Sequence, residues 1–190
     1  MKVNFALINS ICWIVFCLVW VLGAVYNSYK APVAKQKRFS YDWLIFAGLY
    51  WLISHYVSLQ HLTILRINIS WLEWIGTALL LISTLFTLWA RLVLGKMWAT
   101  NAAVKTEHSL ITEGPYQITR NPIYTGILGM VLGSAFSLGE GLILLGSIAV
   151  LLFFQNRIRL EEQLMTQTFG EQYLQYKNSV PKLVPRIKFN

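Results

Sequence analysis

Long runs of apolar residues alternate with short polar stretches along this chain. A helix needs about 20 residues, at 1.5 Å each, to cross the hydrocarbon core of a bilayer. The pattern therefore predicts five membrane-spanning helices, over residues 5–26, 43–59, 71–94, 122–138 and 142–155. The fourth and fifth runs are separated by little more than Gly139, Glu140 and Gly141, so we expect a tight antiparallel hairpin.

The composition agrees with a membrane protein. The chain has 190 residues, of which 56% are hydrophobic and 13% charged, and it contains eight tryptophans. An ordinary soluble domain has about twice this share of charged residues. A single Lys2 precedes the first apolar run and no clean cleavage site follows it, so we expect a membrane anchor rather than a signal peptide. The expected fold class is an all-α integral membrane protein.

The positive charges predict an orientation. Fourteen of the 16 lysines and arginines fall in alternate connecting segments, and only Lys2 and Arg66 lie on the other side. The positive-inside rule then places the C-terminus in the cytoplasm and the N-terminus outside. The net charge of +8 is explained by this topology and by contact with anionic lipid headgroups, so no nucleic-acid partner is expected.

Small residues form a stripe in the fourth apolar run. Gly126, Gly129, Gly133 and Ser134 follow one another at spacings that keep them roughly on one helical face. Such a stripe allows a second helix to approach closely. The alternative is a thin groove wall that admits an acyl or prenyl chain. Cys12 and Cys17, both in the first run, are expected to be packing residues, and no metal site is predicted.

A polar cluster precedes the fourth run. Asn121 and Pro122 suit the N-cap and first positions of a helix, and Tyr124 follows one turn later. A helix N-terminus next to Arg120 can bind a carboxylate or a phosphate. The alternative is that Arg120 reaches the lipid headgroups and the remainder is a loop with a capped helix.

A second polar cluster follows the fifth run. If that helix continues beyond the membrane, Arg157 and Glu161 lie four residues apart on one face, with Glu162 beside them. Arginine before glutamate is the less stabilising order, which favours a functional role, although a solvated helix face is the alternative. The hairpin brings both clusters to the same membrane face, where they can share a pocket.

These residues resemble the isoprenylcysteine carboxyl methyltransferase family of integral-membrane methyltransferases, which is related to the phospholipid methyltransferases. The resemblance covers roughly residues 94–185. Its motifs are His108-Ser109-Leu110-Ile111, Gly114-Pro115-Tyr116, Arg120-Asn121-Pro122-Ile123-Tyr124, Arg157 with Glu161-Glu162, and Phe169-Gly170-Glu171-Gln172-Tyr173-Leu174-Gln175-Tyr176. Any one of these motifs is weak alone, but the ordered set is specific.

The resemblance implies S-adenosyl-L-methionine as the methyl donor, bound by a cytosolic loop and a C-terminal helix. It divides the chain into an N-terminal three-helix membrane region, 1–95, and a catalytic region, 96–190. The implied catalytic residues are Arg157, for the acceptor's carboxylate, with Arg120 close by, and Glu161. The implied cofactor residues are His108, Ser109, Leu110, Ile111, Gly114, Tyr116, Asn121, Pro122, Ile123, Tyr124, Glu161 and Glu162.

One residue departs from the family pattern. Asn121 stands where well-studied members have histidine, and an amide can cap a helix or bind a cofactor but cannot titrate near neutral pH. A carboxylate acceptor is already ionised and needs no base, whereas an amine must first lose a proton. The expected reaction is therefore carboxyl O-methylation of an isoprenylcysteine-like or other amphiphilic lipid. The alternatives are a phospholipid or amine N-methyltransferase, an NADPH-binding membrane reductase of the sterol reductase type, and a non-catalytic scaffold.

Overall fold

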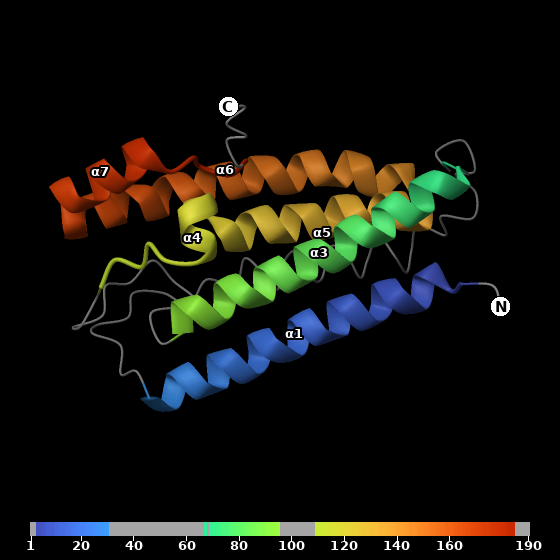
Figure 1. Cartoon of the computed structure of the whole chain (residues 1–190), viewed down its shortest axis with the longest axis horizontal. Coiled ribbons are helices and arrows are strands. Elements are labelled where there is room, and N and C mark those ends of the chain that lie inside the picture. The colour runs from blue at the N-terminus through green and yellow to red at the C-terminus, as the bar shows by residue number, and fades with distance from the viewer. Residues whose placement is uncertain (1–2, 31–66, 68, 96–108, 185–190) are drawn as a thin grey trace.

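The computed structural model describes residues 3–30, 67, 69–95 and 109–184, and within these ranges the regular elements are helices. Figure 1 shows the long helices lying side by side, with the short helix α4 and the last helix α7 gathered at one end. The helices are α1 (Phe5–Lys30), α3 (Ser70–Leu94), α4 (Pro115–Ile118), α5 (Pro122–Leu138), α6 (Gly141–Phe169) and α7 (Glu171–Ser179).

Three of the described helices are long and apolar enough to cross a membrane: Phe5–Asn27, Ser70–Leu94 and Gly141–Phe169. Helix α5 is apolar but shorter. Large apolar side chains on the outer faces of α1 and α3 are exposed, Leu92 for instance by 73%, as a lipid-facing surface requires. The expected all-α integral membrane fold is confirmed, while the second predicted run, 43–59, lies outside the described residues.

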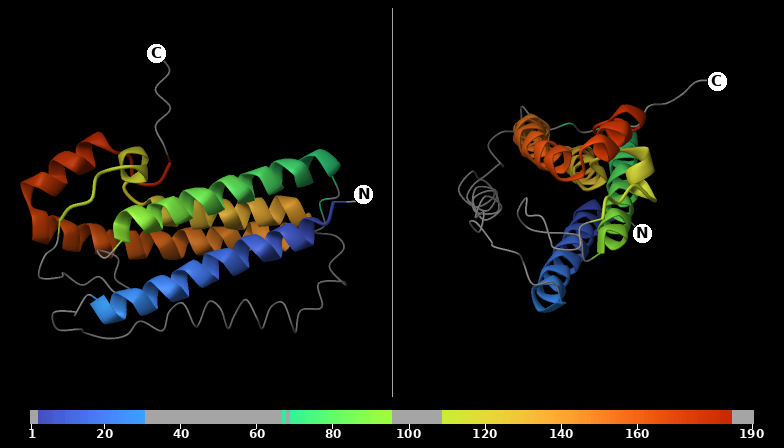
Figure 2. Two further views of the ribbon diagram at one scale, coloured as in Figure 1. Left: turned by 60° about the horizontal axis from the view of Figure 1, so that its bottom comes forward. Right: turned by 90° about the vertical axis from the view of Figure 1, so that its left-hand side faces the viewer.

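Helix α6 extends well beyond the predicted apolar run. The run was expected to end at residue 155, but the helix continues to Phe169. Hydropathy predicts where the apolar stretch ends, but it does not predict where the helix ends, because backbone hydrogen bonds continue beyond the apolar residues. Figure 2 shows α7 folding back alongside the end of α6. Because α6 continues through these positions, Arg157 and Glu161 lie on the same helical face, as predicted.

The small-residue stripe of α5 packs against α3. A Cβ atom added at Gly126 would collide with Thr87, and one added at Gly129 would collide with Ser83. A Cβ atom at Gly133 would lie 2.6 Å from the backbone nitrogen of Leu80. The helix-packing interpretation is confirmed, and the groove-wall alternative is wrong for these three glycines because α3 fills the space beside them.

Helix α1 is joined to α3 and α5 by polar contacts. Asn9 Nδ2 donates to Ser137 Oγ at 3.0 Å, and Ser137 Oγ lies 2.7 Å from Thr77 Oγ1. Trp13 Nε1 donates to Ser134 Oγ at 3.0 Å. Hydrogen bonds between membrane helices stabilise their register modestly, by about 0.6 kcal/mol each. Cys12 is buried in the same contact, as expected of a packing residue, whereas Cys17 is exposed.

The turn between α5 and α6 is as tight as predicted. Gly139 adopts a left-handed conformation with φ of 65°, and its amide donates to the last turn of α5. A Cβ atom here would lie 2.7 Å from the carbonyl oxygen of Ile67, so glycine is required for both reasons. The hairpin sends α6 back along α5 to the end where α4 and α7 lie (Figure 1).

Candidate active site

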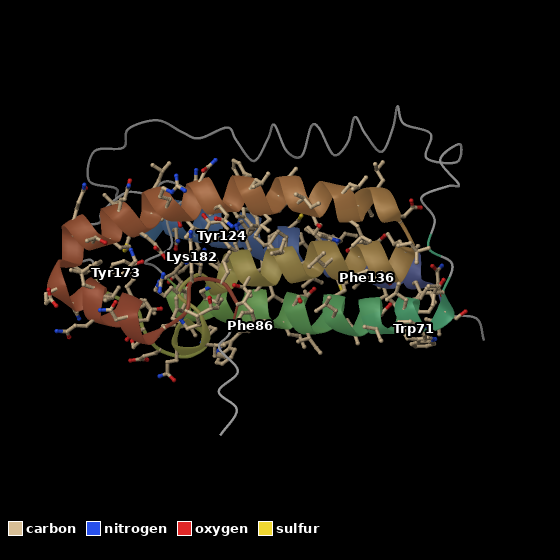
Figure 3. The ribbon with its side chains drawn as sticks, turned by 90° about the horizontal axis from the view of Figure 1, so that it is seen from above. Trp71, Phe86, Tyr124, Phe136, Tyr173 and Lys182 are labelled. Atoms are coloured by element: carbon tan, nitrogen blue, oxygen red, sulfur yellow. The ribbon has the colours of Figure 1, made fainter. Side chains whose placement is uncertain are left out.

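The predicted polar clusters meet at one end of the helix bundle. Figure 3 shows Tyr124, Tyr173 and Lys182 at this end, while Trp71 and Phe136 lie at the other. The chain reaches this end through Gly114, whose φ of 56° reverses its direction, and through the single turn of α4. Pro122 then begins α5. Residues 114–124 and 154–162 are thereby brought together.

Three side chains form the centre of the site, here called the Glu161 cluster: Tyr124, Arg157 and Glu161. The Tyr124 hydroxyl donates to Glu161 Oε1 at 2.7 Å, and Arg157 Nε lies 3.5 Å from the same oxygen. The side chains of Arg157 and Glu161 are 25% and 30% exposed, so the cluster is sheltered but accessible. The Tyr124 ring packs on Phe154, with 4.8 Å between the ring centroids.

Arg120 and Glu162 form a second, more deeply buried pair. Arg120 Nη2 lies 3.0 Å from Glu162 Oε1, and the two side chains are 8% and 10% exposed. Lys177 Nζ lies 3.7 Å from the other carboxylate oxygen. The guanidinium of Arg120 therefore points into the protein, and the alternative that it reaches lipid headgroups is wrong. The alternative that Glu162 lies on a solvated helix face is also wrong, because its side chain is buried.

Asn121 occupies the N-cap position of α5, but its side chain makes no capping hydrogen bond. The predicted capping role of this side chain is therefore wrong. Its amide nitrogen instead donates to the carbonyl oxygen of Lys182 at 3.0 Å and faces Glu162 Oε1 at 3.4 Å. This partner lies in the C-terminal chain, so the contact could not be foreseen from local sequence.

Buried tyrosines of α4 and α7 contact one another beside the site. Tyr176 donates its hydroxyl to the carbonyl oxygen of Tyr116 at 2.7 Å, and both rings are buried. Burial raises the pKa of Tyr116 and of Tyr173, and it raises the pKa of Tyr176 to about 12. These phenols are therefore neutral at physiological pH. The bend at Gly170, with φ of 52°, turns Tyr173 and Tyr176 inward.

Leu110 of the predicted cofactor segment borders a wide-open cavity of about 550 Å³. Leu110 and Thr112 line it from the segment before α4, and Gln172, Gln175 and Tyr176 line it from α7. None of the Glu161 cluster lines this cavity. Ser109 is exposed, and Ile111, Gly114 and Ile123 are partly buried, while His108 lies outside the described residues.

Several contributors were not predicted as site residues. Phe154 supplies an aromatic face, and Thr119, which is fully buried, donates to the carbonyl oxygen of Lys182 at 3.0 Å. Nothing in their sequence context distinguishes them from helix and loop residues. Within residues 3–30, 69–95 and 109–184, no group of three or more histidine, cysteine, aspartate or glutamate side chains could hold a metal ion.

The side chains around Glu161 fit a cationic methyl donor of the sulfonium type. Glu161 supplies a partly exposed carboxylate, and the Tyr124 and Phe154 rings lie next to it. Aromatic faces and carboxylates both attract an onium cation. The site can therefore favour a positively charged reactant, and the Arg157 guanidinium can bind an anionic one beside it.

Comparisons with known proteins agree with this geometry. The phospholipid methyltransferase family model matches residues 71–172. Protein-S-isoprenylcysteine O-methyltransferase B of Arabidopsis thaliana is 31% identical over 62% of this chain and 61% of its own length. The protein-S-isoprenylcysteine O-methyltransferase of Xenopus laevis is 36% identical over 64% of this chain and 43% of its own length.

A solved structure is also similar. It is that of the eukaryotic intramembrane Ras methyltransferase, an isoprenylcysteine carboxyl methyltransferase, and it aligns with a TM-score of 0.63 and 26% identity. The alignment covers 80% of this chain and 55% of that one, so the chain spans only part of these relatives. The match of the family model over more than half the chain establishes that the protein belongs to the phospholipid methyltransferase family, with its resemblance to the isoprenylcysteine carboxyl methyltransferases confirmed.

Proposed function

We propose that this protein is a membrane-embedded methyltransferase that uses S-adenosyl-L-methionine to methylate the carboxylate of an isoprenylcysteine-like or other amphiphilic lipid. The observation that carries the proposal is the Glu161 cluster, in which the Tyr124 phenol lies 2.7 Å and the Arg157 guanidinium 3.5 Å from the same carboxylate oxygen of Glu161. The similarity to isoprenylcysteine methyltransferases supports the same chemistry.

Glu161 and the adjacent rings would hold the positively charged end of the donor. When bound, S-adenosyl-L-methionine supplies an electrophilic methyl group on a sulfonium. The Glu161 carboxylate and the face of Tyr124 favour this charge and orient it, while Tyr116, Ser109, Leu110, Ile111 and Ile123 contribute the remaining walls in the proposal. Positioning alone provides much of the acceleration in such a displacement.

Arg157 would bind the acceptor. A carboxylate with a pKa of about 3.5 is ionised at neutral pH and needs no general base. Arg157 projects from α6 beside Glu161, with its side chain 25% exposed. A guanidinium binds a carboxylate through up to two parallel hydrogen bonds, which would fix the nucleophilic oxygen next to the donor site. Arg120 in this scheme positions Glu162 rather than the acceptor, because its guanidinium is turned inward.

The proposed site faces the cytoplasm. It lies at the end of the bundle where α3 finishes and α7 packs, opposite the N-terminal end of α1 (Figure 1). Arg91, Arg120, Arg157, Arg159 and Lys177 belong to the cation-rich side of the chain. A donor would enter from the cytosol, and a lipid acceptor would enter laterally from the bilayer.

The description of the matching family keeps amine N-methylation as a second candidate. An amine substrate would first have to lose a proton to a general base. Glu161 would then have to take up this proton and also hold the positively charged end of S-adenosyl-L-methionine. The reductase alternative is not favoured, because the family model and the relatives named above are methyltransferases.

Substitution of Glu161 tests the donor site. Glu161→Ala should abolish binding of S-adenosyl-L-methionine, and Glu161→Gln should weaken it about tenfold or more, because a charge-assisted interaction of about 1.5–3 kcal/mol is lost. Glu161→Gln should affect S-adenosylhomocysteine less, since its sulfur is uncharged. Calorimetric titration in detergent measures both affinities. Glu113→Gln is the control, since Glu113 is exposed. Unchanged affinities in the Glu161 variants would remove this residue from the donor site.

A further inference from the structure

The chain after α7 is tied to the corner between α4 and α5. Residues 180–183, here called the strap, run across this corner, and every one of their carbonyl groups accepts a hydrogen bond. The Arg120 amide donates to the Pro181 oxygen at 2.9 Å, and the Arg120 guanidinium donates to the Val180 oxygen. Asn121 Nδ2 donates to the Lys182 oxygen at 3.0 Å.

Two threonines complete the attachment. Thr119 Oγ1 donates to the Lys182 oxygen at 3.0 Å, and Thr125 Oγ1 donates to the Leu183 oxygen at 2.8 Å. Thr119 is fully buried and its hydroxyl also accepts from the Asn121 amide at 3.4 Å, so movement of the strap would leave its O–H without an acceptor. Leaving a buried O–H without an acceptor is costly, which makes the attached arrangement the stable one.

The strap is connected to both halves of the candidate site. Arg120 and Asn121, which hold it, also contact Glu162, the neighbour of Glu161 along α6. Val180, its first residue, lines the same cavity as Leu110 and Thr112. Figure 3 shows Lys182 of the strap at the same end of the molecule as Tyr124.

We propose that the strap closes the donor site and that Thr119 and Thr125 are positioning residues that fasten it. This inference rests on the proposed function, since it assigns the strap to the site that holds the methyl donor. The hydroxyls act through the strap backbone and do not touch the reacting atoms. Loosening the strap should therefore lower donor affinity and leave turnover at saturating donor nearly unchanged.

The test compares the double variant Thr119→Val/Thr125→Val with Thr168→Val in the full-length protein. Thr125 and Thr168 each donate to the carbonyl four residues earlier in their own helix, but only Thr125 also reaches the strap. Trypsin cleavage after Lys182, followed by mass spectrometry, reports release of the strap. Calorimetric titration with S-adenosylhomocysteine reports the donor site. Thr119→Ser/Thr125→Ser keeps both hydroxyls and should behave as the wild type.

Loss of two hydrogen bonds, each about 1 kcal/mol, should accelerate cleavage after Lys182 about tenfold or more and weaken S-adenosylhomocysteine by a similar factor. Saturating S-adenosylhomocysteine should slow this cleavage in the wild type. Faster cleavage with unchanged affinity would overturn the inference while leaving the proposed function intact, and unchanged cleavage would overturn it as well. A wild type that does not bind S-adenosylhomocysteine at all would overturn the proposed function and this inference with it.

Discussion

Glu161 and Glu162 are adjacent in sequence, yet their surroundings differ. Glu162 is buried between Arg120 and Lys177, and its side chain is 10% exposed. Glu161 faces Tyr124 and Arg157 with a side chain that is 30% exposed. A buried, doubly paired carboxylate holds helices together, whereas an accessible one can bind a ligand. The difference comes from the helix, in which neighbouring side chains point about 100° apart.

Arg157 can be tested by kinetics. Arg157→Ala should raise the KM for a carboxylate acceptor about tenfold to a hundredfold, because a charge-assisted interaction worth about 1.5–3 kcal/mol is removed. The affinity for the donor should be preserved. Steady-state rates over a range of acceptor concentrations give the KM. Arg159→Ala is the matched control, since Arg159 lies on the same helix and is exposed. An unchanged KM in Arg157→Ala would exclude this arginine from acceptor binding.

Glu162 should contribute mainly to stability. Glu162→Gln leaves the buried Arg120 guanidinium without a charged partner, and breaking a buried pair in this way costs about 3–5 kcal/mol. We expect a clear decrease in the thermal unfolding midpoint of the protein in detergent. Glu171→Gln, at an exposed position at the start of α7, should leave the midpoint unchanged. Equal midpoints for the two variants would contradict the structural role of the Arg120–Glu162 pair.

Helices α3 and α5 approach closely because small residues line both surfaces. Gly76 of α3 faces Phe136 and Ser137 of α5, and Gly133 of α5 faces the backbone of α3. In a bilayer, where hydrophobic burial between helices gains little, close packing supplies much of the attraction. The α3–α5 pair is therefore the frame on which the corner at Asn121 is held.

This packing predicts an effect of Gly133→Leu. A side chain there meets the backbone of Leu80, which cannot move aside as a flexible side chain can. We expect destabilisation of about 1–3 kcal/mol or more, seen as a lower unfolding midpoint or loss of monodisperse protein in detergent. Gly146→Leu on α6 is the control, because nothing lies within 4 Å of a Cβ atom added at Gly146. Equal stability of both variants would contradict the described α3–α5 contact.

At the level of helices, much was predictable from the sequence, because apolar length and the hairpin at Gly139 are local properties. The end of α6 at Phe169 was not, since the helix outlasts its apolar run. The stripe at Gly126, Gly129 and Gly133 left two interpretations open, because sequence does not say what occupies the space beside a glycine. Asn121 occupies the predicted N-cap position, but its side chain makes no capping bond and contacts the Lys182 carbonyl, 61 residues away, instead.

The whole molecule places its chemistry at one end of a membrane bundle. The contacts of the Glu161 cluster, of the Arg120–Glu162 pair and of the strap join α5, α6 and the chain after α7. Figure 3 shows Tyr124, Tyr173 and Lys182 at this end. The sequence motifs indicated which residues belong to this end. The pairing of Tyr124 with Glu161, however, depends on how α5 and α6 pack, and no local pattern specifies that distance.

The central claim is that this end of the bundle binds a methyl donor. Calorimetric titration of the detergent-purified protein with S-adenosylhomocysteine and, separately, with NADPH tests it most directly. The account predicts micromolar binding of S-adenosylhomocysteine and no binding of NADPH. Binding of NADPH alone would contradict the account and assign the site to reductase chemistry.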